Sequence, residues 1–330
     1  MLVETDSMAS ATAGEAFLAD GEERLVIAEV AGRLMASGSQ QIDDPEWVAL
    51  ARGAWEELPD RLRGSIRRFR RDSGPYGSLL VSGLPVGEED LPPTPTIAGS
   101  VQRTATVPAS VLAMVACGLG DPTAFRAEKT GALVQDVVPV PGMEAFQGNA
   151  GSVRLSFHTE NAFHEHRPDF VMLLCLRADP DRVAGLRLAC VRACLPRLSE
   201  AAREALFSQS FVTAAPPSFG AGGANTTHAV LRGPAGDPDM CVDLAATSAT
   251  TAAGRQALLE LQRVFEATAQ TIRLVPGDLA IVDNRVTVHG RDAFTPRYDG
   301  RDRWLQRTFV SADLRRSRDF RPDDSYVLDR

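Results

Sequence analysis

The N-terminal third of the chain carries apolar residues at the spacing of amphipathic helices. Between residues 22 and 37 they recur with a helical period, at Leu25, Val26, Val30 and Leu34. A second helix is expected to begin at Asp44–Pro45, because an acidic residue followed by proline is typical of a helix start. Its arginine-rich continuation over residues 61–74 is interpreted as a solvated helix face rather than an anion site. A further helix is expected over residues 107–118.

After Gly74–Pro75 the pattern changes to short apolar runs bounded by glycine and proline, which predict strands. These runs occupy residues 77–85, 131–140, 152–157, 169–177, 186–193, 229–233, 240–244, 279–290 and 303–312. Residues 84–106 are rich in proline and glycine and are expected to form a surface loop. One helix is predicted among the strands, over residues 249–270, with Leu258, Leu261, Val264 and Phe265 on one face.

Many short strands, helices gathered at the N-terminus and one helical insertion predict an α+β fold. The core is expected to be a β-sandwich or jelly roll, because the alternating strand–helix order of a doubly wound sheet is missing from the sequence. The sequence has no internal repeat and no linker long enough to separate domains. We therefore expect a flexible tail over residues 1–20 and a single domain over residues 21–330.

Composition narrows the class of protein. The chain of 330 residues is 44% hydrophobic and 24% charged, which excludes a wholly disordered protein. Its net charge of −8 argues against a nucleic-acid partner. No stretch approaches the length of a membrane span, and the N-terminus lacks the features of a signal peptide, so we expect a cytoplasmic protein without a membrane partner. The five cysteines lack the paired spacing of a metal site and are expected to be reduced, buried thiols.

Metal-capable side chains are densest over residues 156–170. His158 and Glu160 flank one residue, so in an extended chain they point to the same face. His289, at the end of an apolar strand, is the best candidate for a third ligand. Two imidazoles and one carboxylate are the facial triad of non-haem Fe(II) oxygenases, which leaves positions open for a chelating co-substrate and O₂. The alternatives are that His164 and His166 compete as ligands, or that His289 is a core histidine.

Arginines follow His289 on the last predicted strand. Arg303 and Arg307 have the same parity there and are expected to face the interior. A guanidinium in an apolar barrel requires an anion, and its planar fork suits a carboxylate. Arg303 is therefore a candidate for the far carboxylate of an iron-chelating dicarboxylic keto acid. The alternative is that these arginines pair with nearby acids such as Asp299 or Asp302.

Two long segments resemble a known family. HTENAFHEHRPDFVMLLCLR, at residues 158–177, and DNRVTVHGRDAFTPRYDGRDRWLQR, at residues 283–307, are similar to the clavaminate synthase-like Fe(II)/2-oxoglutarate dioxygenases. Within that group they resemble the amino-acid hydroxylases of nonribosomal peptide pathways, the asparagine oxygenase and arginine hydroxylase group. The resemblance extends from about residue 127 to residue 310 and implies a double-stranded β-helix, or jelly roll, with N-terminal helices and a helical insertion.

The resemblance also assigns the cofactor residues. It implies that His158, Glu160 and His289 are the iron ligands and that Arg303, fourteen residues after His289, binds the C5 carboxylate of 2-oxoglutarate. The sequence departs from the family at one position. Leu186 stands where a threonine that helps to bind 2-oxoglutarate is usual, so Arg303 is expected to do more of the anchoring.

The same resemblance offers candidates for substrate binding. It implies that Arg307 holds the carboxylate of an amino acid and that Glu128 lies near its amino group, while Asn149 and Asp243 read its side chain. Each has a plainer alternative. Glu128 would be a surface acid beside Lys129, the single lysine of the chain; Asn149 would be a turn residue; and Asp243 would cap the segment that follows it.

The expected function follows from these assignments. The chain is expected to be a dioxygenase that uses Fe(II), 2-oxoglutarate and O₂ to hydroxylate Cβ or Cγ of a polar L-amino acid resembling asparagine or glutamine, free or carrier-bound, for a peptide natural product such as an antibiotic. An arginine, citrulline or other basic amino acid is the alternative substrate, because Asp243 can bind a guanidinium. A metal-binding jelly roll that binds a small molecule without catalysis is the alternative from another class.

Overall fold

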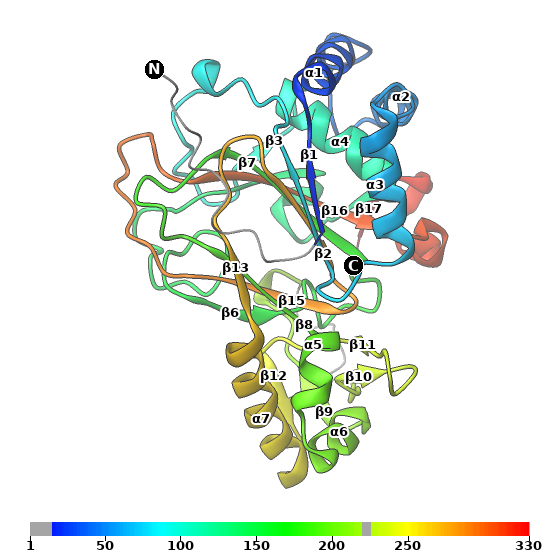
Figure 1. Ribbon diagram of the computed structural model, residues 1–330, viewed down its shortest axis with the longest axis vertical. Coiled ribbons are helices and arrows are strands. Elements are labelled where there is room, and N and C mark those ends of the chain that lie inside the picture. The colour runs from blue at the N-terminus through cyan, green and yellow to red at the C-terminus, as the bar shows by residue number, and fades with distance from the viewer. Residues whose placement is uncertain (1–14, 220–225, 330) are drawn as a thin grey trace.

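The computed structural model describes residues 15–219 and 226–329, and its centre is a pair of facing β-sheets (Figure 1). The larger sheet has the strand order β1-β2-β14-β7-β16-β4-β17, with β5 and β3 joined to it through β16. The smaller sheet has the order β13-β8-β15-β6. The larger sheet comprises β1 (Glu15–Leu18), β2 (Ser78–Ser82), β3 (Val101–Gln102), β4 (Asp121–Phe125), β5 (Val134–Val137), β7 (Phe170–Arg177), β14 (Leu279–Asp283), β16 (Trp304–Ser311) and β17 (Val327–Leu328). The smaller comprises β6 (Leu155–His158), β8 (Leu186–Cys190), β13 (Gln270–Ile272) and β15 (Thr287–Arg291).

Strand β7 contributes side chains to two hydrophobic cores, one on each face of the larger sheet. Its apolar run is continuous, and alternate side chains point to opposite faces of the sheet. Val171, Leu173 and Cys175 pack in the interior between the sheets, against residues of β8, β14 and β16. Phe170, Met172 and their alternate neighbours pack on the other side, against the N-terminal helices.

The N-terminal helices cover the outer face of the larger sheet (Figure 1). They are α1 (Gly21–Met35), α2 (Pro45–Trp55), α3 (Asp60–Arg71) and α4 (Val107–Leu119). Asp44 caps α2 by accepting from the Glu46 amide, with proline at the first position, as the sequence predicts. The arginine-rich residues lie along α3, where Arg63 and Arg67 pair with Glu56 at the surface, as expected of a solvated face.

A second layer of helices covers the outer face of the smaller sheet, at the bottom of Figure 1. It contains α5 (Val191–Cys194), α6 (Glu200–Phe207) and α7 (Ala252–Thr268). Two short antiparallel strand pairs accompany them, β9 (Phe211–Thr213) with β12 (Thr247–Ala249) and β10 (Leu231–Arg232) with β11 (Asp239–Met240). The α+β prediction with a jelly-roll core, N-terminal helices and a helical insertion is therefore confirmed.

The structure differs from the sequence prediction at several elements. Residues 15–18 form β1, which pairs in parallel with β2, so ordered chain begins before residue 21; the rest of the expected tail, residues 1–14, lies outside the described residues. The run at 279–290 is two strands separated by a turn. Strand β4 and helix α6 were not predicted, because their short apolar patterns are interrupted by proline, threonine and charged residues.

Two further predictions concern the interior and the membrane. All five cysteines are free and buried, as expected of reduced thiols. In the described parts of the chain, no helix combines the length and the apolar character that a bilayer crossing requires.

Candidate active site

Cross-strand register brings two of the predicted ligands together. His158, the last residue of β6, lies directly opposite His289 of β15, and their ring centroids are 4.3 Å apart. Gly290 permits this pairing, because a Cβ atom there would lie 2.6 Å from the carbonyl oxygen of Leu155 on β6. The backbone of β6 therefore approaches β15 closely just beside both histidines.

Glu160 lies two residues beyond the end of β6 and is held by Asn284. The Glu160 amide donates to Asn284 Oδ1 at 2.8 Å, and Asn284 Nδ2 donates to the carbonyl oxygens of Glu160 at 3.1 Å and of Pro168 at 2.8 Å. Asn284 is fully buried, so these bonds fix the Glu160 backbone without competition from water. The Glu160 carboxylate Oε2 lies 3.5 Å from His289 Nε2.

This cluster fits a metal ion of the kind that the sequence indicates. One ligand atom from each of His158, Glu160 and His289 can be chosen so that all lie within 4.8 Å of one another, which small side-chain rotations would bring around one ion. Among the described residues, the buried Nδ1 atom of His289 has no hydrogen-bond partner. Two imidazole nitrogens and one carboxylate form the set that suits Fe(II) with open coordination positions.

Electrostatics prepares these groups to bind a cation. Burial raises the pKa of Glu160, but the Arg307 guanidinium, a hydrogen bond from His289 and the charge of His158 outweigh it and hold the pKa well below its usual range. Burial and the neighbouring His158 lower the pKa of His289. The carboxylate is thus ionised and the imidazole neutral, which are the states that bind metals.

Arg307 of β16 joins this cluster to the predicted substrate residues. Its Nη1 donates to Glu160 Oε2 at 3.0 Å, and its Nη2 contacts both the Glu128 carboxylate and the Gln135 side-chain oxygen. Burial lowers the pKa of Arg307, but Glu160 and Glu128 outweigh it and the net shift is upward. Arg307 pairs with these two acids and not with Asp299 or Asp302, whose carboxylates accept backbone N–H groups.

Asn149 and Asp243 line the same pocket as His158 and Glu160 of the metal-binding cluster. The pocket encloses about 480 Å³ and is lined also by Glu128 and Arg307. With its amide oxygen turned to the guanidinium, Asn149 accepts from Arg307 Nη1 at 3.0 Å and Nη2 at 3.2 Å. The backbone of Asp243 forms an isolated antiparallel β-bridge with that of His158. The Asp243 Oδ1 atom accepts from the amides of Ala245 and Ala246, so it also caps the following turn.

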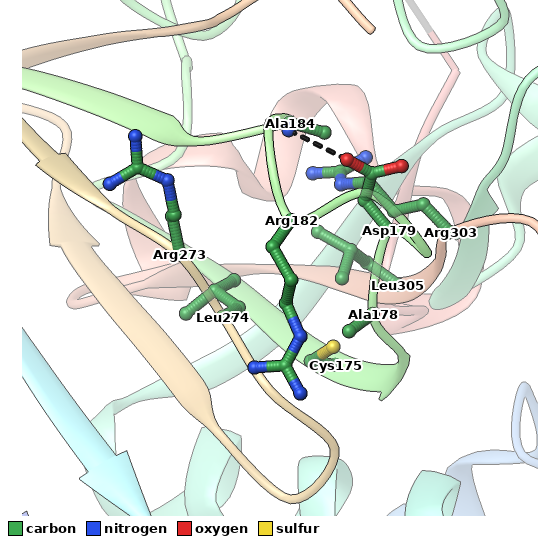
Figure 2. Close-up of a pocket in the computed structure, with 9 residues that line it drawn as sticks. All are labelled: Cys175, Ala178, Asp179, Arg182, Ala184, Arg273, Leu274, Arg303 and Leu305. Atoms are coloured by element: carbon green, nitrogen blue, oxygen red, sulfur yellow. Dashed lines mark hydrogen bonds between the residues drawn. The ribbon is translucent and has the colours of Figure 1, made fainter. Parts of the chain in front are cut away.

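Arg303 lies in a separate small pocket at another point of the barrel interior (Figure 2). The pocket is lined by Cys175, Leu274 and Leu305 from the interior core and by Asp179. Figure 2 shows Arg303 beside Asp179, whose carboxylate accepts from the Ala184 amide at 3.0 Å. Arg303 is only 6% exposed, and burial lowers its pKa. The structure therefore does not bring Arg303 into contact with the metal-binding cluster, although both lie within the barrel.

Leu186, at the position where a threonine is usual, is buried in the interior core on β8. Its partner across the sheet is Arg291 of β15, which is 4% exposed. Burial and the positive charge of Arg303 lower the pKa of Arg291. This end of the interior thus contains two guanidinium groups near an apolar side chain.

The competing histidines lie elsewhere. His164 packs edge-on against Phe125, with ring centroids 4.8 Å apart, and its Nδ1 accepts the His166 amide. His166 packs against Phe320. Neither belongs to the metal-capable cluster found among the described residues.

Two residues of the site were not predicted from the sequence: Asn284, which holds Glu160, and Gln135, which contacts Arg307. Lys129, noted in the sequence only as the neighbour of Glu128, is partly buried, with its Nζ donating to the Ser100 carbonyl at 3.0 Å and contacting that of Asp136. Glu128 is likewise no surface acid, because its carboxylate pairs with buried Arg307. A polar residue directly after a buried strand, as Asn284 follows β14, is the one signal that the sequence offered.

Comparisons with known proteins agree with this geometry. A model of the family described as taurine catabolism dioxygenase TauD, TfdA family matches residues 76–309. The chain is 61% identical over 310 residues to L-asparagine oxygenase of Streptomyces coelicolor, covering 94% of this chain and 93% of that protein. It is 34% identical over 261 residues to clavaminate synthase 2 of Streptomyces clavuligerus, covering 78% and 80%.

A solved structure is similar over nearly the whole chain. The crystal structure of asparagine oxygenase in complex with Fe(II), (2S,3S)-3-hydroxyasparagine and succinate superposes with a TM-score of 0.93 and 60% identity, covering 96% of this chain and 99% of that one. The predicted resemblance to clavaminate synthase-like oxygenases is therefore confirmed.

Proposed function

The chain belongs to the taurine catabolism dioxygenase TauD, TfdA family, and from this premise we propose that it hydroxylates Cβ of free L-asparagine with Fe(II), 2-oxoglutarate and O₂. The observation that carries the proposal is one pocket in which His158 and Glu160 of the metal-capable cluster lie with an acid and an arginine suited to an amino acid. The asparagine oxygenase with 61% identity supports the choice of substrate.

We assign the iron to His158, Glu160 and His289, and the C5 carboxylate of 2-oxoglutarate to Arg303. Iron bound with 2-oxoglutarate supplies the oxidising chemistry, in which O₂ is reduced, 2-oxoglutarate becomes succinate and CO₂, and one oxygen atom enters the C–H bond. The protein's own residues bind and orient the substrate and keep water from the reacting carbon.

Glu128 and Arg307 provide the two charges that a free amino acid needs. In the structure they pair with each other. A substrate inserted between them gives its ammonium group to Glu128 and its carboxylate to Arg307, so each protein charge exchanges one partner for another. Arg307 keeps its bond to Glu160, which places the substrate beside the proposed iron ligands.

The same charges favour a free amino acid over a carrier-bound one. A thioester has no carboxylate, so Arg307, which is 3% exposed, would receive no anion in exchange for the Glu128 carboxylate that the substrate's ammonium group takes. Asn149 and Asp243 add donors and an acceptor suited to the side-chain amide of asparagine. Product hydroxyasparagine is suited to incorporation into a peptide natural product such as an antibiotic. The five free thiols support a reducing, cytoplasmic location.

A succinate assay across the twenty amino acids plus citrulline and ornithine tests the proposal. We expect succinate and a product 16 mass units heavier than its substrate with L-asparagine, and neither from the His289→Ala variant. Preferred turnover of arginine or citrulline would show that this amino acid, and not asparagine, is the substrate. Metal binding without succinate formation from any amino acid would support the alternative of a non-catalytic, metal-binding protein.

A further inference from the structure

Two arginines in the interior lack a carboxylate partner among the residues that the structure describes. Arg291 and Arg303 are 4% and 6% exposed, and within the described chain neither forms an ion pair. Arg291 Nη2 donates to the Val153 carbonyl at 2.9 Å, and its guanidinium lies 5.2 Å from the centroid of the Phe294 ring. Its buried Nε has no hydrogen-bond partner in the described part of the chain. Asp179 beside Arg303 directs its Oδ2 to the amides of Val183 and Ala184. Two buried cations without a paired anion are costly, so this region is built to receive one.

The register directs both arginines to the same end of the barrel. Arg291 is two residues after His289 on β15 and shares its face, about 7 Å farther along the strand. Its partner Leu186 pairs in turn with Ile272, and the pocket of Arg303 is lined by Ala184 and Leu274, each two residues from that pair. The positive charge of Arg303 also lowers the pKa of Arg291. Arg291, on β15 of the smaller sheet, and Arg303, directly before β16 of the larger sheet, therefore face the same region of the barrel interior.

We propose that Arg291 is a second arginine for the distal carboxylate of 2-oxoglutarate and acts together with Arg303. A 2-oxo acid that chelates a metal beside His289 with its keto-acid end extends its far carboxylate along β15 toward Arg291. Leu186 has no polar group to offer at this position, so the hydrogen-bond donors come from the guanidinium groups. The inference rests on the proposed use of 2-oxoglutarate and adds a binding residue to it.

Two ligands that differ only at the far end test this role. The full chain is loaded with Mn(II) in the absence of O₂ and titrated calorimetrically with 2-oxoglutarate or with 2-oxobutanoate, which has the same chelating end but no distal carboxylate. For Arg291→Met we expect the Kd of 2-oxoglutarate to rise about tenfold or more, as for a lost charged hydrogen bond, and that of 2-oxobutanoate to stay within error. Arg291→Lys, which keeps the charge, should lose less of the preference.

Arg187→Met is the matched control. Arg187 is a buried arginine on the neighbouring strand β8, but it pairs with Glu266 at 2.6 Å on the opposite face of the sheet. We expect this variant to keep the wild-type ratio of the two Kd values even if it unfolds more easily.

The outcomes separate the two proposals. An unchanged ratio in Arg291→Met, or an equal loss of affinity for both ligands, would overturn the role of Arg291 and leave it a structural residue that holds Val153 and Phe294. If the wild-type protein with metal binds no 2-oxoglutarate, the proposed function itself fails. Should Arg291→Met not fold, the comparison of Arg291→Lys with wild type decides, because a structural role predicts no change in the ratio.

Discussion

At the scale of single residues, the site depends on side chains that touch no substrate. Asn284 is the clearest case, because its amide bonds to both the N–H and the carbonyl of Glu160 and is fully buried. Groups that orient a metal ligand are worth about 10–100-fold in metal affinity. Asn284 is thus a positioning residue for the proposed iron ligand.

Replacing Asn284 should therefore weaken metal binding before it affects anything else. For Asn284→Ala we expect Co(II) or Mn(II) to bind about 10–100-fold more weakly, because the Glu160 backbone is released. Titration of the metal followed by Co(II) absorption measures this directly. Gln102→Ala, which removes a surface side chain bonded to the Thr104 carbonyl, is the control and should bind as wild type. Equal affinities in both variants would contradict the positioning role.

Lys129 offers a second test at this scale, because it is the single lysine. Burial and the nearby Arg307 lower its pKa to about 8. Between that value and the unfolded value of 10.5, the folded chain has released a proton that the unfolded chain keeps, so the lysine's contribution to stability rises with pH. In protein labelled with ¹³C at lysine Cε, the one resonance should titrate near pH 8. A midpoint above 10 would show that the amine is solvated, and Lys129→Met identifies the signal by its loss.

At the scale of elements, the pairing of β6 with β15 assembles the metal-binding cluster. The cross-strand register sets His158 opposite His289, and Gly290 lets the two backbones approach. A side chain at position 290 would meet the Leu155 carbonyl, which backbone cannot easily avoid. The sheet, rather than either histidine alone, therefore determines the ligand geometry.

We expect Gly290→Ala to cost about 1–3 kcal/mol in the free energy of unfolding, as overpacking does, and to weaken metal binding by moving β6. Urea unfolding and metal titration measure the two effects. Gly32→Ala in α1 is the matched control, since a Cβ there has nothing within 4 Å, and it should raise stability by about 0.5–1 kcal/mol. Wild-type metal affinity in Gly290→Ala would show that metal binding does not depend on the close pairing of β6 with β15.

At the scale of the whole molecule, two helical layers enclose a polar site within an apolar barrel. Helices α1–α4 cover one sheet and α5–α7 cover the other, so both sheets are packed on two faces. Buried Arg291, Arg303, Arg307 and Glu160 sit inside this shell. Ligands that neutralise them should stabilise the entire fold, because they bind only the folded chain.

Metal and 2-oxoglutarate together should therefore raise the melting temperature. At 100 times its Kd, a ligand adds about 2.7 kcal/mol to the free energy of unfolding. Calorimetry with Mn(II) and 2-oxoglutarate under N₂ should show this gain in wild type and lose the metal-dependent part in His289→Ala. Equal gains in both proteins would mean that the metal binds outside the cluster of His158, Glu160 and His289.

The sequence by itself predicted the fold class and the residue types of the site. Alternating and helical apolar patterns depend on local geometry, so they indicated the strands, α1, α2, α4 and α7, and the spacing of His158 and Glu160 indicated two ligands on one face. The position of His289 at the end of an apolar strand made it the best candidate for the third ligand. Resemblance supplied the substrate residues, because no local rule links positions so far apart along the chain. Short elements such as β1 and β4 were missed, since pairing partners far along the chain stabilise them.

Only the tertiary structure decided which charges meet. It paired Arg307 with Glu128 and Glu160 rather than with the acids adjacent in sequence, assigned Asn284 to Glu160, and buried Arg291 and Arg303 without a carboxylate partner among the described residues. The reason is physical: a charge buried in a barrel must be balanced by whatever the opposite sheet presents, and strand register, which sequence spacing does not encode, determines what that is.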